Sequence, residues 1–113
     1  MEHAHAIDKI QKLAEKRKSD KIIKYLDSAD AEVVVAALKA LSDIKDEDSV
    51  NSIAGMIDNE NDEIRKEAAC ALGEIGSEYA KTYLQHRMTT EKNEEIKKAI
   101  MDALHAIAAK KNA

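Results

Sequence analysis

Residues 62–75 read DEIRKEAACALGEI, and the pattern of this stretch occurs three times in the chain. The segments 31–44 (AEVVVAALKALSDI) and 94–107 (EEIKKAIMDALHAI) align with it without gaps, so the copies begin 31 and then 32 residues apart. Counted from the third residue of each segment, apolar residues stand at positions 0, +4, +7, +8 and +11. On a helix these positions cover roughly 100° of one face. Each segment is therefore predicted to be an amphipathic helix.

A repeat of this length is typical of solenoids, in which one supersecondary unit recurs and stacks on its neighbours. Shorter helical patterns lie between the copies, so each unit is predicted to be a pair of helices. We predict seven helices, near residues 3–17, 19–27, 30–44, 47–58, 62–76, 78–88 and 92–110. The first of them reads as a degenerate copy of the second helix of a pair.

The composition points to an all-α fold. The 113 residues include no Pro, Phe or Trp and only three Gly, whereas sandwiches and barrels depend on aromatic and β-branched residues and on Gly/Pro turns. Good helix formers dominate instead. We expect residues 1–113 to form one repeat domain, with repeats near 19–46, 47–77 and 78–110.

Residues 62–76 resemble the short HEAT-like repeat of phycobilisome-lyase proteins. That repeat has an acidic residue near its start, followed by Val/Ile-Arg, Ala-Ala, Ala-Leu-Gly and Ile-Gly. The other copies depart from it, since Val34 and Lys97 replace the Arg while Ser42 and His105 replace the Gly. The resemblance implies a right-handed α-α superhelix, a HEAT-like solenoid of about seven antiparallel helices. Tetratricopeptide repeats are the competing interpretation, but their aromatic and Pro signature residues are missing.

The resemblance also implies where a partner would bind, because the second helices of HEAT-like stacks line the concave side. We expect a partner-binding surface formed by Val34, Val35, Lys39, Arg65, Lys66, Cys70, Lys98, Asp102 and His105. The three valines at 33–35 cannot all face the core of a helix. Either Val34 packs on the first helix and Val35 contacts a partner, or both pack on that helix or stand singly exposed.

No grouping of residues in the sequence indicates catalysis or metal binding. His3 and His5 are two residues apart, which separates them by about 200° around a helix, so they do not chelate a metal jointly there. Cys70 is the single cysteine, which fits a reducing compartment. A lone thiol without an adjacent base is usually inert. We expect neither an enzyme nor a cofactor nor a metal site.

The sequence favours a non-catalytic protein-interaction module, an adaptor or scaffold whose partner is another protein. One alternative is an accessory subunit of a bilin lyase-like modifying enzyme, which only the resemblance supports. The other is nucleic-acid binding through Lys9, Lys12 and Lys16, which the net charge of −4 disfavours. No apolar run approaches the roughly 18 residues of a membrane span, and the first residues do not read as a signal peptide. We therefore expect a cytoplasmic protein, with a monomer favoured over a dimer.

Overall fold

The computed structural model of the protein describes residues 2–112, which form helices and no strand. The helices are α1 (Glu2–Glu15), α2 (Ser19–Ile23), η1 (Lys24–Asp27), α3 (Ala31–Ile44), α4 (Glu47–Gly55), η2 (Met56–Asp58), α5 (Asp62–Ile75), α6 (Glu78–Met88) and α7 (Glu94–Asn112). The predicted all-α fold is confirmed, and the 3-10 turns η1 and η2 complete two of the expected helices. None of the described helices is both long and apolar enough to cross a membrane.

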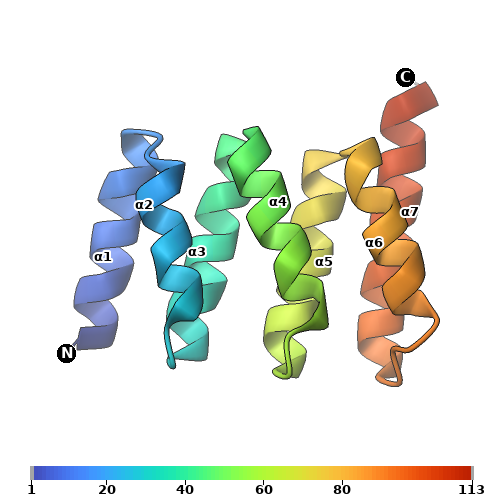
Figure 1. Ribbon diagram of the computed structural model, residues 1–113, viewed down its shortest axis with the longest axis horizontal. Coiled ribbons are helices and arrows are strands. Elements are labelled where there is room, and N and C mark those ends of the chain that lie inside the picture. The colour runs from blue at the N-terminus through green and yellow to red at the C-terminus, as the bar shows by residue number, and fades with distance from the viewer. Residues whose placement is uncertain (1, 113) are drawn as a thin grey trace.

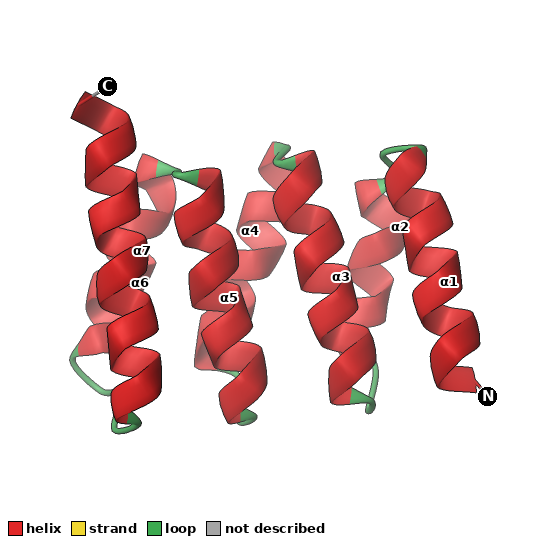
Figure 2. Cartoon of the chain, turned by 180° about the vertical axis from the view of Figure 1, so that it is seen from behind, coloured by secondary structure: helices red, strands yellow, loops and turns green. Residues whose placement is uncertain are grey.

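The helices form two layers. Figure 1 shows α2, α4 and α6 side by side in front, and Figure 2 shows α1, α3, α5 and α7 side by side behind them. The molecule is a slab with principal extents of 38 × 31 × 16 Å. The first helix α1 lies next to α3 in the layer of the second helices, where a degenerate copy of a second helix is expected to lie.

Several helix boundaries differ from the prediction by one or two residues, and two of these differences have a clear local reason. The helix expected at 3–17 ends at Glu15, and the chain then turns through Arg17, whose φ of 54° is left-handed. The helix expected at 92–110 begins at Glu94, because the side-chain oxygen of Asn93 accepts hydrogen bonds from the first free N–H groups of this helix.

Neighbouring repeats pack through a second buried row of side chains, beside the predicted apolar stripe. A Cβ added to Gly73 would lie 2.8 Å from the Cα of Ala103, so this row of α5 faces α7. The buried members of the row are Arg65, Ala69 and Gly73 on α5 and Val34, Leu38 and Ser42 on α3. On α7 the same row includes Met101, which is 41% exposed because no helix follows α7 in the described part of the chain.

Arg65 and Glu91 form a buried ion pair that connects the turn before α5 with the turn before α7. The Nε and Nη2 groups of Arg65 donate to the two carboxylate oxygens of Glu91 at 2.8 and 3.0 Å. The Nη1 group of Arg65 donates to the backbone carbonyls of Asn59 and Glu60 at 2.9 and 3.1 Å. Since Glu91 follows α6 and the two carbonyls precede α5, these bonds fix the second repeat against the third.

The buried ion pair changes the titration of its carboxylate. Hydrogen bonds from the Arg65 guanidinium lower the pKa of Glu91 from 4.5 to about 2, and the Asn93 N–H and the Arg87 guanidinium act in the same direction. Burial of the carboxylate opposes this shift. A carboxyl group whose pKa is lower in the folded state than in the unfolded state stabilises the fold at pH values above its unfolded-state pKa. This contribution is lost as the pH falls toward 2.

We expect Glu91→Gln to reduce the dependence of stability on pH. The shift from 4.5 to about 2 corresponds to at most about 3.5 kcal/mol of folding free energy, because one pKa unit is worth about 1.4 kcal/mol. The variant should be less stable than the wild type by about 1–3 kcal/mol at pH 7, and this difference should shrink between pH 5 and pH 2. Urea unfolding followed by circular dichroism at several pH values measures the difference.

Glu63→Gln is the matched control, because Glu63 is an exposed glutamate in the first turn of α5. Its stability should stay within about 0.5 kcal/mol of the wild type at every pH. A stability difference for Glu91→Gln that is the same at pH 7 and pH 2 would contradict the assigned role of the carboxylate.

Candidate functional site

Two of the nine residues predicted to form a partner surface are buried. Val34 is 1% exposed and Arg65 is 8% exposed, so their assignment to an accessible surface was wrong. The prediction treated each helix separately, whereas in the solenoid the row that contains both residues faces the next repeat. By this register Val34 lies on the α5 side of α3 rather than against the first helix, and Arg65 is held by Glu91.

The other seven predicted residues are accessible to different degrees. Val35 and Lys66 are half-buried, and the exposed residues are Lys39, Cys70, Lys98, Asp102 and His105. His105 lies in the row of α7 that has no following helix, away from the grooves described next. The structure therefore brings together only part of the predicted set.

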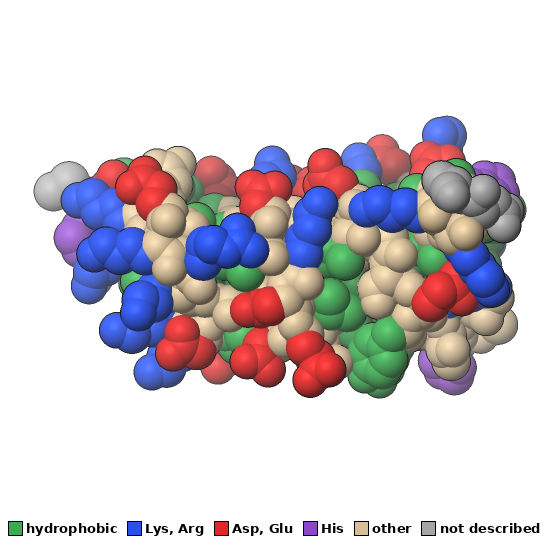
Figure 3. All heavy atoms as spheres, turned by 90° about the horizontal axis from the view of Figure 1, so that it is seen from above, with side chains coloured by type: hydrophobic (Ala, Val, Ile, Leu, Met, Phe, Trp, Pro, Cys, Tyr) green, Lys and Arg blue, Asp and Glu red, His purple; other side chains and the backbone are tan. Residues whose placement is uncertain are grey.

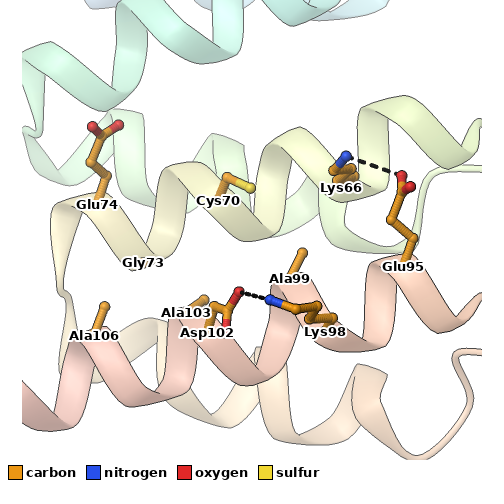
Figure 4. A pocket seen from close by; sticks show the side chains of 10 residues that line it. All are labelled: Lys66, Cys70, Gly73, Glu74, Glu95, Lys98, Ala99, Asp102, Ala103 and Ala106. Atoms are coloured by element: carbon orange, nitrogen blue, oxygen red, sulfur yellow. Dashed lines mark hydrogen bonds and ion pairs between the residues drawn. The ribbon is translucent and has the colours of Figure 1, made fainter.

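Four of the predicted residues line one open groove between α5 and α7 (Figure 4). Its volume is about 570 Å³, and its walls carry Lys66, Cys70, Lys98, Asp102, Glu74 and Glu95. The floor consists of residues without a long side chain, namely Gly73, Ala99, Ala103 and Ala106. We call this the α5–α7 groove. The groove is hollow because these small residues fill little of the space above the contact between the two helices.

A smaller groove lies between α3 and α5 and adjoins the first. Its lining includes Lys39, Ser42 and Glu67, and it shares Cys70 and Glu74 with the α5–α7 groove. Cys70 therefore stands between the two hollows. Together they make an uneven surface that crosses all three second helices.

Four of the five charged side chains of the α5–α7 groove form two ion pairs. The Nζ of Lys66 lies 3.0 Å from Oε1 of Glu95, and the Nζ of Lys98 lies 3.2 Å from Oδ2 of Asp102 (Figure 4). The hydrogen bond that Lys66 donates to Glu95 raises the pKa of Lys66. Because these pairs are solvent-exposed, each contributes little to stability. They leave the groove with both signs of charge, and the exposed carboxylate of Glu74 adds one negative charge to the two pairs.

The Cys70 thiol is less acidic than a free thiol. Partial desolvation raises its pKa, the Glu67 carboxylate adds to the rise, and the Lys66 ammonium opposes it. A reactive cysteine needs the opposite shift, since the thiolate is the nucleophile. Desolvation and the Glu67 carboxylate therefore decide the direction of the shift, and the thiol is not activated.

Within residues 2–112, no three His, Cys, Asp or Glu side chains are grouped so that they could hold a metal ion. His3 instead pairs with the N-cap of α3, because its Nδ1 lies 2.7 Å from Oδ2 of Asp30. This bond lowers the pKa of Asp30. The sequence pattern did not reveal this contact, since the two residues are 27 positions apart.

Gly73 is expected to be indispensable to the close contact of α5 and α7. A Cβ at this position would lie 2.8 Å from the Cα of Ala103, and a backbone atom cannot move aside as a flexible side chain does. Gly73→Ala should therefore lower the free energy of unfolding by about 1–3 kcal/mol. Urea denaturation monitored by circular dichroism measures the change.

The matched control is Gly55→Ala at the end of α4, where the backbone is helical and nothing lies within 4 Å of the added Cβ. This substitution should raise the free energy of unfolding by about 0.5–1 kcal/mol. If both alanine variants were stabilised alike, the two helices would not be in the contact described.

Comparison with known proteins agrees with this architecture. A family model described as HEAT repeats matches residues 4–105, which is most of the chain. No curated protein matches the chain significantly. The closer resemblance to phycobilisome-lyase repeats is not tested by the family match and stays a prediction. The chain belongs to the HEAT-repeat family.

Proposed function

We propose that the chain is a protein-binding module that takes a segment of another protein on the outer surface of α3, α5 and α7. HEAT repeats commonly mediate protein–protein interaction, and stacked repeats create extended binding surfaces. The observation that carries the proposal is the α5–α7 groove, which is hollow, floored by Gly and Ala, and continuous with a second hollow at Cys70.

The floor of the groove suits the side chains of a partner. Since Gly73 and the three alanines project little, a bound segment can insert side chains between α5 and α7 and bury apolar surface there. Protein interfaces combine such an apolar centre with a polar rim. The Lys66–Glu95 and Lys98–Asp102 pairs supply that rim and can exchange their partners for groups of the bound segment.

The chemistry of the groove supports binding rather than catalysis. Its cations are neutralised by neighbouring carboxylates, and its thiol has a raised pKa. Activated nucleophiles and general bases require perturbations that favour the reactive form. HEAT-repeat proteins are, moreover, generally non-catalytic. The partner is therefore best sought as a protein, with a mixed-charge contact surface.

The double variant Ala106→Arg, Lys66→Glu is expected to weaken partner binding without unfolding the chain. The first substitution projects a long cationic side chain into the groove from an exposed site, and the second sets a carboxylate opposite Glu95 in place of a cation. Affinity capture from the native host with quantitative mass spectrometry identifies the partner. With the purified partner, the variant should then raise Kd by about tenfold or more.

The double variant Thr82→Arg, Lys92→Glu is the control. It changes the net charge by the same amount at exposed positions on α6 and in the turn before α7. This control should retain the partner at the wild-type level, and circular dichroism should show that both variants are folded. A partner that both double variants hold as tightly as the wild type would place the binding surface elsewhere, and the proposal would fail.

A further inference from the structure

Another groove lies at the N-terminal end of the solenoid, between α1 and the α2–η1 helix. Its volume is about 530 Å³, and its lining consists of Lys9, Lys12, Leu13, Lys16, Lys21, Lys24 and Tyr25. Five of these seven residues are lysines and none is acidic. Figure 3 shows Lys and Arg side chains gathered at the end of the molecule that carries α1 and α2. We call this the lysine groove.

The lysines of this groove have little internal compensation. Only Lys12 pairs with a carboxylate, with its Nζ 3.4 Å from Oδ2 of Asp8 one helical turn away. Among the residues whose side chains are described, the other four lysines have no carboxylate within 4.0 Å. Like charges held this close raise the local potential and attract anions.

At the opposite end of the solenoid, exposed lysines are paired with carboxylates, so an exposed end does not need an excess of positive charge. There Lys97 pairs with Glu94, Lys98 with Asp102, and Lys111 with Glu78. A terminal repeat needs a polar outer face, which a mixture of both signs provides. The one-sided charge of the lysine groove therefore exceeds what a solvated end of a solenoid needs.

The groove also has an apolar floor. Leu13 and Tyr25 are half-buried and pack against the hydrophobic core, with parts of their side chains open to the groove. An apolar floor between basic rims suits a ligand that carries acidic groups on both sides of one apolar side chain. A simple phosphate ion would use the rims and leave the floor empty.

We propose that the lysine groove binds a short acidic peptide segment of another protein, whose single apolar side chain rests on Leu13 and Tyr25. This is a second binding surface, separate from the α5–α7 groove, and the two share no residue. The partner is recognised by charge complementarity at the five lysines and by burial of one apolar side chain.

The extent of the positive surface favours a peptide over a nucleic acid. Lys9 on α1 and Lys16 directly after its end are seven residues apart, about two helical turns or about 10 Å. Nucleic-acid binding follows a phosphate backbone over a longer basic surface. Next to α2 the first turn of α4 presents the exposed carboxylates of Glu47 and Asp48. These carboxylates repel a polyanion that runs beyond the groove but leave room for a short acidic segment.

Fluorescence anisotropy with defined probes tests the proposal. The first probe is a fluorescein-labelled ten-residue peptide of Glu and Asp with one central Leu, and the second has Gly in place of that Leu. The third is a labelled oligonucleotide of fifteen thymidines. All are titrated with the wild-type protein at about 150 mM salt, where long-range attraction is screened.

The double variant Lys16→Glu, Lys21→Glu should bind the Leu peptide about tenfold more weakly than the wild type, or worse. Its matched control is Lys92→Glu, Lys111→Glu, which makes the same change in net charge at exposed positions near the other end. The control should change the affinity less than about twofold. Because all four lysines are exposed, circular dichroism should show folded variants. The Gly peptide should bind several-fold more weakly than the Leu peptide.

Three results would overturn the proposal. Equal weakening by both double variants would mean attraction by overall charge alone. Equal binding of the Leu and Gly peptides would remove the role of the apolar floor. Tighter binding of the oligonucleotide than of either peptide would make the groove a nucleic-acid site. The variant Ala106→Arg, Lys66→Glu should bind the Leu peptide as the wild type does, so this test is independent of the α5–α7 groove.

Discussion

The second helices α3 and α5 each require a following second helix, because their buried side chains cover two adjacent faces. On α5 the stripe that includes Ile64 and Leu72 packs between the layers, while the row that includes Ala69 and Gly73 packs on α7. The contact is close since Gly73 meets the backbone of Ala103 directly. The same small residues leave the space above the contact unfilled. The packing that joins the repeats thus also produces the α5–α7 groove.

The joints between repeats differ in chemistry although their backbone arrangement is the same. Between the second and third repeats, Arg65 reaches Glu91 and the carbonyls that precede α5. The aligned residue of the first full repeat is Val34, whose buried side chain is apolar and can form no ion pair. The first joint therefore depends on apolar burial, and the second depends in addition on a charged pair. Acid weakens the second joint through this pair, and Val34 gives the first joint no corresponding sensitivity.

The fold could be predicted from the sequence because a period of about 31 residues and a helical stripe are local properties. The buried row could not, since it depends on which helix lies beside which. A single-helix view therefore placed Val34 and Arg65 on the surface. It also gave no role to Glu91, which stands in a turn outside any periodic pattern. The register did bring Lys66, Cys70, Lys98 and Asp102 into one groove, and their part in binding is a proposal.

The lysine groove and the α5–α7 groove differ in charge, and the force that the protein exerts on an acidic partner depends on the distance of that partner. The chain carries a net charge of −4, so an acidic partner is repelled by the molecule as a whole at long range. At physiological ionic strength charges are screened beyond about 8 Å, and the partner then responds mainly to the side chains near it. The residues that line the lysine groove supply five ammonium groups and no carboxylate. Screening therefore weakens the long-range repulsion by the net charge more than the short-range attraction by the lysines. An acidic segment can consequently recognise the N-terminal end of an acidic protein. The α5–α7 groove carries charges of both signs, so its affinity for a partner depends more on shape and apolar contact.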